Sequence, residues 1–380
     1  MVKSKLKGVL KECNPELLSG SLGFVSYAPD TDYQEPLRVL QSTLPLLCVG
    51  GTSLGDPFDT GDDVFSASAA FTAVPGLRHA TSISHPLNLE HAASQMADVY
   101  GDCLEKLGSR PKLLLAFLPM LGDLFVDDFL AALFSLAGDV PVFGGVVSDD
   151  DLRSGRSAVF HGGVAYPDRL LLVGLAGDIS PVFGIGYDFA VPSDYSPVVT
   201  AAKGNIVVSV DDMPFAAYMR KLGFGPEEVN EFPISIQLRD PDAAAGSIPR
   251  AVALTRLDSA TGAGVFSEAV PTGIGISPGF LNRDNIARST ATAVDMLLGN
   301  MASAGKAGRR FGMLLGVSCV TRYYTMSAGD RVEAELLDRM LPKDLPKFGY
   351  FGFGEICPTF DRAGKMRNGC HGQTVALCAF

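Results

Sequence analysis

One acidic residue stands in an otherwise aromatic and glycine-rich stretch near the end of the printed sequence. The run FGYFGFGEICPTF, residues 348–360, carries aromatic side chains and glycines up to Glu355. The aromatic residues predict a strand that enters a hydrophobic core, where a carboxylate must find a partner or change its pKa. Glu355 therefore has three candidate roles: the partner of a buried cation, a catalytic acid, or the floor of a ligand pocket.

A thiol and a guanidinium follow another apolar run. In GVSCVTRYY, residues 316–324, Cys319 ends an expected buried strand and Arg322 follows three residues later. A nearby cation lowers the pKa of a thiol and activates it, whereas a buried cysteine without such help behaves as a small apolar residue. Arg322 can form a bidentate pair with a carboxylate, supplied either by a ligand or by Glu355.

The run GTSLG, residues 51–55, matches the G-x-S-x-G pattern of a nucleophile elbow. Such an elbow needs a helix directly after the serine, but Pro57 and Gly61 interrupt the chain there. Nothing in the sequence places a histidine beside Ser53. A polar glycine turn that presents backbone N–H groups to a ligand is the better interpretation.

Other ligand-binding patterns are incomplete. The sequence has no phosphate-binding loop, and GIGISPG, residues 273–279, lacks the dinucleotide-binding spacing. The acidic runs DTGDD (59–63) and SDDD (148–151) lack calcium-loop spacing and are interpreted as turn caps. The five histidines form no metal-binding pair, so no metal site is predicted, although a single histidine can still ligate haem iron.

Composition limits the class of protein. The chain has 380 residues, of which 47% are hydrophobic and 19% charged, so it can bury a sizeable core. Its net charge of -11 argues against nucleic acid and anionic membrane surfaces as partners. No apolar run reaches membrane-spanning length, the N-terminus lacks a signal-peptide core, and seven scattered cysteines suit reduced thiols. We expect a soluble, cytoplasmic protein.

Alternating helix and strand signals position these residues. Residues 89–147 show a long amphipathic helix, a strand, a short helix and a strand rich in glycine and aromatic residues. Residues 283–357 show the same order, which is either a pseudo-repeat or the coincidence expected of αβαβ units in an α/β protein. We predict an α/β fold with two related halves of mixed β-sheet flanked by helices. Within residues 157–177, two strand signals predict a hairpin.

Several motifs, taken in their order along the chain, indicate a protein family. They are VGGTSLGD (49–56), PVFGGVVSDD (141–150), the run from 198 to 223, SCVTR (318–322), GYFGFGEI (349–356) and HGQT (371–374). Together they resemble the FIST family of sensory proteins, which have linked FIST-N and FIST-C domains. The chain departs from the family pattern at Gly51, where the family has cysteine, and at Gly372, where it has asparagine. The resemblance implies a FIST-N-like domain over 1–222 and a FIST-C-like domain over 223–380.

The resemblance also implies a function. FIST proteins are cytoplasmic sensory modules proposed to bind small molecules such as amino acids, and some members bind haem and sense nitric oxide. Because many members are fused to an output domain and this chain has no room for one, signalling here needs a separate partner protein. No cofactor is assigned from the sequence.

We therefore expect a non-catalytic protein that binds an amino-acid-like ligand in a cleft between its two halves. The ligand ammonium would contact Glu355, and its carboxylate would contact Arg322 or turn N–H groups. The alternatives are an enzyme that uses Cys319 or Ser53 as nucleophile, and a haem-based gas sensor. The residues expected to bind the ligand are Gly50, Thr52, Ser53, Gly55, Gly144, Gly145, Cys319, Arg322, Gly354 and Glu355.

Overall fold

A computed structural model describes most of the chain. The described residues are 21–61, 67–72, 74, 76–121, 126–150, 155–188, 197–231, 234–239, 250–326, 330–360 and 364–380. Parts of both acidic runs, at residues 62–63 and 151, lie outside them.

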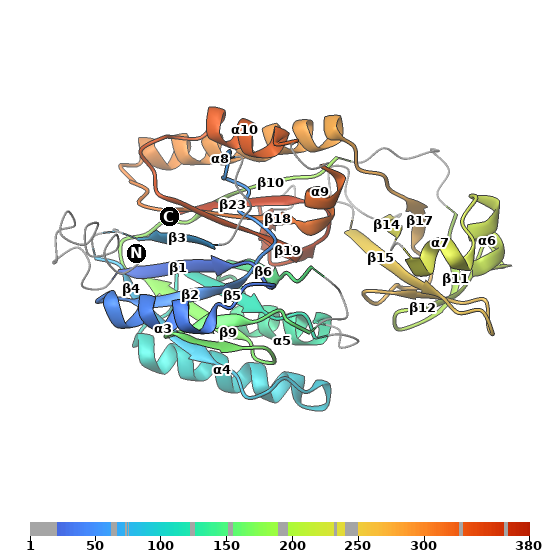
Figure 1. The fold of residues 1–380 in the computed structure, drawn as a ribbon, viewed down its shortest axis with the longest axis horizontal. Coiled ribbons are helices and arrows are strands. Elements are labelled where there is room, and N and C mark those ends of the chain that lie inside the picture. Colours follow the sequence, from blue (N-terminus) through green and yellow to red (C-terminus); the bar gives the residue numbers. More distant parts are fainter. Residues whose placement is uncertain are drawn as a thin grey trace. The chain divides into compact units, whose positions relative to one another are not determined.

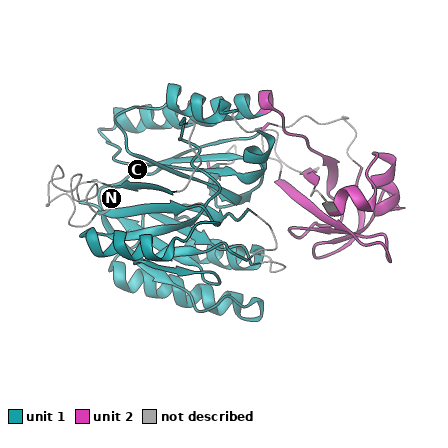
Figure 2. Cartoon of the chain, in the orientation of Figure 1, with its two compact units in different colours: residues 1–187, 286–360, 365–380 teal, residues 188–285, 361–364 magenta. Residues whose placement is uncertain are grey.

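The chain packs as two compact units (Figure 2): unit 1 comprises 1–187, 286–360 and 365–380, and unit 2 comprises 188–285 and 361–364. The predicted sequence-domain division after residue 222 stays a prediction.

A nine-stranded mixed sheet forms the centre of unit 1, with the strand order β10-β23-β18-β19-β6-β5-β9-β4 and β22 paired beside β19 (Figure 1). Its strands are β4 (Arg78–Ile83), β5 (Leu113–Leu118), β6 (Val142–Val147), β9 (Leu171–Ala176), β10 (Val182–Gly186), β18 (Leu314–Cys319), β19 (Lys347–Ile356), β22 (Cys370–His371) and β23 (Val375–Ala379). Strands β5, β9 and β18 are buried at every residue. Continuous apolar runs are typical of strands covered on both faces.

Two pairs of helices pack on this sheet, and Figure 1 shows α8 lying with α10 and α4 with α5. The helices are α4 (Ala92–Leu107), which follows the short η1 (Leu89–His91), α5 (Asp127–Ala137), α8 (Arg283–Lys306) and α10 (Val332–Met340). Helix α4 buries Ala92, Met96, Val99, Cys103 and Leu107, because steps of three and four residues return to one helix face. It ends at Gly108, whose φ of 65° closes the last turn.

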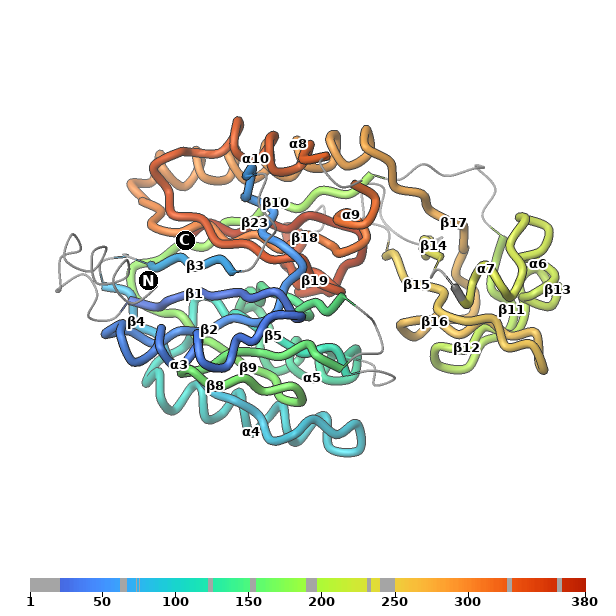
Figure 3. Tube along the Cα trace, viewed as in Figure 1, coloured from blue at the N-terminus to red at the C-terminus, as the bar shows by residue number. Residues whose placement is uncertain are grey.

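The two predicted halves meet inside the nine-stranded sheet. Strands β5 and β6 are parallel, β18 and β19 are parallel, and β6 pairs with β19 antiparallel at the centre. Antiparallel β9 and β23 flank the two parallel pairs in the same way. The predicted fold class, with two related halves of mixed sheet flanked by helices, is confirmed. The halves also interlock, because β10 pairs with β23 although the two are far apart in sequence (Figure 3).

A second sheet in unit 1 has five strands in the order β3-β1-β2-β7-β8. Its elements are β1 (Leu22–Tyr27), α3 (Gln34–Thr43), β2 (Leu47–Thr52), β3 (Ala67–Phe71), β7 (Val159–His161) and β8 (Val164–Tyr166). The hairpin predicted within residues 157–177 is partly wrong. Strand β7 turns through Gly162 and Gly163, both at positive φ, to pair with β8, while β9 joins the nine-stranded sheet.

Unit 2 contains a seven-stranded sheet in the order β11-β12-β16-β15-β14-β17, with β13 paired to β12. Its elements are β11 (Val199–Lys203), β12 (Ile206–Val210), β13 (Met213–Pro214), α6 (Phe215–Lys221), α7 (Pro226–Glu231), β14 (Ile234–Arg239), β15 (Arg250–Leu257), β16 (Gly264–Phe266) and β17 (Gly275–Pro278). One face of this sheet packs with α6 into a core that includes Phe215, Ile236, Leu254 and Ile276.

Candidate functional site

The two glycine-rich strands β2 and β6 are built alike. Gly50 of β2 lies opposite Val25 of parallel β1, and Gly144 of β6 lies opposite Ala116 of parallel β5. The two glycines have φ values of 152° and 136°, and an added Cβ would lie 1.9 and 2.1 Å from the opposing carbonyl oxygens. Only glycine fits such a close approach at positive φ. The glycines that the sequence assigned to a ligand site thus have a structural role in bringing strands together.

The segments that follow β2 and β6 lie side by side. Thr52 Oγ1 donates to the backbone oxygen of Ser148 at 2.8 Å, and the Ser148 amide donates back to the Thr52 oxygen at 3.2 Å. The backbone amide of Leu54 donates to Ser148 Oγ at 3.1 Å. The structure therefore brings together the two glycine turns that the sequence placed in one site.

Ser53 joins this turn to β19 through hydrogen bonds. Its Oγ donates to the Gly55 oxygen at 2.6 Å and accepts from the backbone amide of Phe351 at 2.9 Å. The side chain is completely buried, and no histidine is among its hydrogen-bond partners in the described chain. Such a serine lacks the base that a nucleophilic hydroxyl requires.

Glu355 lies where the two halves pair, opposite Gly145 on β6 and His371 on β22. The register of β19 against β6 shifts between Gly352 and Glu355, as in a β-bulge. A bulge re-aims the side chains that follow it. Gly145 also has no room for a side chain, because an added Cβ would lie 2.4 Å from the Gly354 oxygen.

The Glu355 carboxylate is completely buried, and only one of its two oxygens accepts hydrogen bonds from described residues. Its Oε2 accepts hydrogen bonds from the backbone amide of Thr374 at 3.1 Å and from Thr374 Oγ1 at 2.8 Å. Its Oε1 has no hydrogen-bond partner in the described part of the chain. Burial raises the pKa of Glu355 to about 8, against the lowering effects of Thr374, the Cys319 thiol and the Arg322 charge.

Two further buried polar groups belong to the same neighbourhood. The Tyr350 hydroxyl, on the same strand, has no hydrogen-bond partner among the described residues. Burial and then the negative charge of Glu355 raise the pKa of Tyr350 well above its usual value. Gln373 precedes Thr374, has the left-handed φ of 61°, and leaves its Oε1 without a partner. We call Glu355, Tyr350, Gln373, Thr374 and Cys319 the Glu355 cluster.

Arg322 does not pair with Glu355. It lies on α9 (Val320–Thr325), and its Nε and Nη2 contact Glu333 Oε2 of α10 at 2.7 and 2.5 Å. Nη1 donates to Ser289 Oγ at 2.8 Å, and Nη2 donates to Thr290 Oγ1 at 2.8 Å. Arg322 and Glu333 are 0% and 1% exposed. Every nitrogen of the guanidinium thus has a partner within the protein, which leaves a ligand carboxylate little to bind.

The sequence allowed two expectations for Cys319, a thiol with a lowered pKa or a buried cysteine that behaves as a small apolar residue, and its burial favours the second. Burial and the nearby charge of Glu355 raise the pKa of the Cys319 thiol to about 12. Its Sγ lies 2.7 Å from Thr321 Oγ1. The arginine that motivated the expectation is neutralised by Glu333, so the local field at the thiol favours the protonated form.

Four residues of this region were missed by reasoning from the sequence. Tyr350 was counted only among the core aromatics, and Glu333 was not singled out. Thr374 and Gln373 lie in HGQT (371–374), which the family resemblance had already identified as a motif. That motif was the signal available in the sequence for the Thr374 contact to Glu355.

No group of three or more histidine, cysteine or acidic side chains that could hold a metal ion occurs among the described residues. Two of the five histidines, His161 and His371, contact other groups through their ring nitrogens. His161 Nε2 lies 2.8 Å from Thr81 Oγ1, and His371 Nε2 lies 3.0 Å from the Cys357 oxygen. Burial lowers the pKa of His161.

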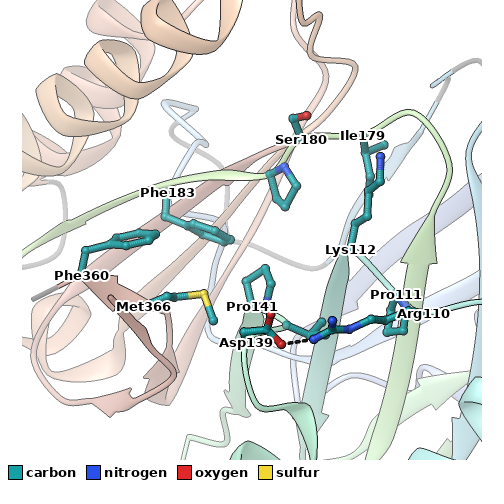
Figure 4. Close-up of a pocket in the computed structure, with 12 residues that line it drawn as sticks. Arg110, Pro111, Lys112, Asp139, Pro141, Ile179, Ser180, Phe183, Phe360 and Met366 are labelled. Carbon is teal, nitrogen blue, oxygen red and sulfur yellow. Dashed lines mark hydrogen bonds and ion pairs between the residues drawn. The ribbon is translucent and has the colours of Figure 1, made fainter. Parts of the chain in front are cut away.

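A separate open pocket of about 450 Å³ lies in unit 1, and none of the predicted site residues lines it. Figure 4 shows Phe183, Phe360 and Met366 on one side of it, and an ion pair between Arg110 and Asp139 on another. Its lining combines apolar side chains with this ion pair, Lys112 and Ser180. It does not include the Glu355 cluster.

The described helices include none that is long and apolar enough to cross a membrane. The cysteines of the described residues, at 48, 103, 319, 357, 370 and 378, form no disulfides.

Comparison with known proteins gives two family matches. A family model described as FIST N domain matches residues 21–213, and one described as FIST C domain matches residues 215–358. No curated protein matches the chain.

Among solved structures, the chain is similar to a cyanuric acid hydrolase described as an evolutionary innovation by structural concatenation. The identity is 8% and the TM-score 0.35, over 99% of this chain and 95% of that one. For the cyanuric acid hydrolase from A. caulinodans, the identity is 10% and the TM-score 0.28, over 95% and 90% of the two chains. For T. maritima PurL complexed with ATP, the values are 12% and 0.21, over 80% and 72%. Similarities this low carry no argument about function.

Proposed function

The chain belongs to the FIST family, whose domains are sensory and ligand-binding in general, and we propose that it binds a small amino-acid-like molecule at the Glu355 cluster. One observation carries this proposal. Glu355 Oε1 is a buried carboxylate oxygen without a hydrogen-bond partner in the described chain. Buried polar atoms are nearly always paired, so an unpaired acceptor of this kind marks a place for a donor from outside the chain.

An ammonium group is the donor that suits this position best. It supplies N–H groups to Oε1 and a positive charge that favours the ionised form of a carboxyl whose pKa is raised to about 8 by burial. Gln373 Oε1, from the residue next to Thr374, also has no partner in the described chain, and we assign it to the same ammonium as a second acceptor. A primary ammonium has enough N–H groups to donate to both acceptors, whereas a ligand with a single N–H can donate to only one of them.

The carboxylate of the ligand needs a donor other than Arg322, because that guanidinium is held by Glu333, Ser289 and Thr290. The Tyr350 hydroxyl has no partner among the described residues and donates readily to a carboxylate. The residues of the cluster are buried, so ligand entry requires movement of the chain that covers them. An enclosed site of this kind favours a small ligand over a peptide.

Calorimetric titration of the full chain with the standard L-amino acids tests the proposal directly. We expect one or a few of them to bind the wild type, and Glu355→Gln to abolish the heat of binding. Glu268→Gln is the matched control, because Glu268 is a carboxylate of unit 2 that pairs with Arg250. Absence of binding to freshly purified wild-type protein that carries no co-purified ligand would contradict the proposal.

An enzymatic function is the second candidate, favoured by one observation. A carboxyl with a pKa of about 8 beside a thiol is the arrangement expected of a general acid or base. The thiol itself argues the other way, because a pKa of about 12 leaves almost no thiolate at neutral pH. A purified protein that shows no Soret band after haem addition would remove the haem alternative.

The remaining parts of the proposal concern the cell. We propose that this protein works in the cytoplasm and transmits ligand binding to a separate signalling protein. The free thiols of the described cysteines are consistent with a reducing compartment. Fractionation of cells that express the tagged protein, and affinity capture with and without the bound amino acid, would test these two statements.

A further inference from the structure

The sheet of unit 2 has a polar face opposite its hydrophobic core. Strands β14 and β17 pair antiparallel, with Gln237 opposite Ser277 and Arg239 opposite Gly275. Side chains alternate along a strand, and residues directly opposite each other share a face. The alternate positions Ile236, Leu238 and Ile276 all pack into the core. Residues Ser235, Gln237, Arg239 and Ser277, which we call the β14–β17 polar face, therefore lie together on the other side.

The polar groups of this face lack partners. Gln237 and Ser277 are only 2% and 4% exposed, yet neither Gln237 Nε2 nor Ser277 Oγ has a hydrogen-bond partner in the described chain. The same is true of Ser235 Oγ. No hydrogen bond or ion pair involves Arg239 within the described residues, and its side chain is half-buried. Three buried polar atoms and a guanidinium, none of them paired with a described residue, are unusual on one small surface, because burial normally requires pairing.

Two glycines lie on either side of Ser277 on this face. Gly275 and Gly279 flank Ser277 along the chain, so β17 presents a single side chain, that of Ser277, to this part of the face. The backbone of Gly279 lies against the Gln237 side chain, and a Cβ added there would lie 2.9 Å from Nε2. The amide of Gln237 is therefore held over β17, next to the Ser277 hydroxyl that lies opposite it.

We infer that the β14–β17 polar face binds the carboxylate of a small molecule. Each of the four groups can donate a hydrogen bond: an amide N–H, two hydroxyls and a guanidinium. A single cation with neutral donors matches the single charge of a carboxylate, whereas a phosphate dianion usually needs more cations. The inference does not depend on the proposal for Glu355, which concerns an acceptor rather than a set of donors.

Thermal unfolding of the full-length protein in different salts tests this inference. The probes are sodium acetate and sodium succinate, compared with sodium chloride and sodium phosphate at equal ionic strength. We expect the carboxylate salts to raise the Tm, with a stabilisation that grows with the logarithm of concentration above the Kd, and the effect to persist in the Glu355→Gln variant. Equal stabilisation by chloride, or stronger stabilisation by phosphate, would overturn the assignment of a carboxylate site.

Substitutions then locate the effect. Arg239→Ala and Gln237→Leu should each weaken the apparent carboxylate affinity by at least about tenfold, because each removes a donor to a charged group. Gly279→Ala should do the same while it keeps every donor, because the added methyl displaces the Gln237 amide. Arg256→Ala is the matched control, since Arg256 is an exposed arginine of the same sheet that already faces Asp258 at 3.7 Å. Unchanged affinity in Arg239→Ala and Gly279→Ala would refute the site.

Discussion

Arg322 and Glu333 form an ion pair that is closed to solvent, with Nη2 and Oε2 2.5 Å apart and side chains 0% and 1% exposed. Glu333→Gln should lower the free energy of unfolding by about 3–5 kcal/mol, because it leaves a buried guanidinium without a counter-charge. Asp338→Asn, which removes an exposed partner of Lys343, should cost no more than about 1 kcal/mol. Urea denaturation of both variants measures the difference, and similar losses in the free energy of unfolding would contradict a large effect of breaking the buried pair.

The raised pKa of Glu355 predicts a pH-dependent stability. The folded protein holds this proton up to a pKa of about 8, whereas an ordinary glutamate loses it near 4.5. The stabilising contribution is therefore complete below pH 4.5 and is lost as the pH rises through 8. We expect the wild type to lose a few kcal/mol between pH 5 and pH 9 relative to Glu355→Gln. Parallel stability curves for the two proteins, from urea denaturation at each pH, would show that Glu355 titrates normally.

The Cys319 thiol should be inert in the folded protein. Its pKa is raised to about 12 and its side chain is buried, whereas Cys370 is half-buried. Iodoacetamide at pH 8, followed by peptide mass spectrometry, should modify Cys370 faster than Cys319. Denatured protein, in which the two thiols should react alike, provides the control. Faster modification of Cys319 in the native state would favour the enzymatic alternative.

Glycine at position 144 should be indispensable for the sheet. Gly144→Ala places a methyl group 2.1 Å from the Ala116 oxygen at a φ of 136°, so we expect loss of several kcal/mol or failure to fold. Gly101→Ala is the matched control within helix α4, because nothing lies within 4 Å of an added Cβ there. That variant should be stabilised by up to about 1 kcal/mol. The melting temperatures of the two variants check both statements.

Much of the fold could be predicted from local patterns. The buried positions of α4 follow from helical spacing, and β5 and β9 from continuous apolar runs. The repeated order of helices and strands indicated two related halves, which the pairing of β6 with β19 joins. The hairpin within residues 157–177 was misjudged because local pattern does not say which sheet a strand enters.

The candidate site depends on contacts that sequence spacing does not encode. Glu355 was identified as an unusual acid, but the bulge that re-aims it arises only when β19 pairs with β6. The contact from Thr374 arises only when the segment between β22 and β23 lies against β19. Arg322 was expected to pair with a ligand or with Glu355. Its partner, Glu333, lies on the next helix, α10. The packing of α10 places Glu333, and not Glu355, against the guanidinium.

Proton release on binding is the measurement that tests the central claim most directly. At pH 7 the Glu355 carboxyl, with a pKa of about 8, is mostly protonated in the free protein, and an ammonium ligand favours its ionised form. Calorimetry of the binding amino acid in buffers of different ionisation enthalpy should show release of nearly one proton at pH 7 and much less at pH 9. Binding without proton release at pH 7, or binding that Glu355→Gln leaves intact, would contradict the account.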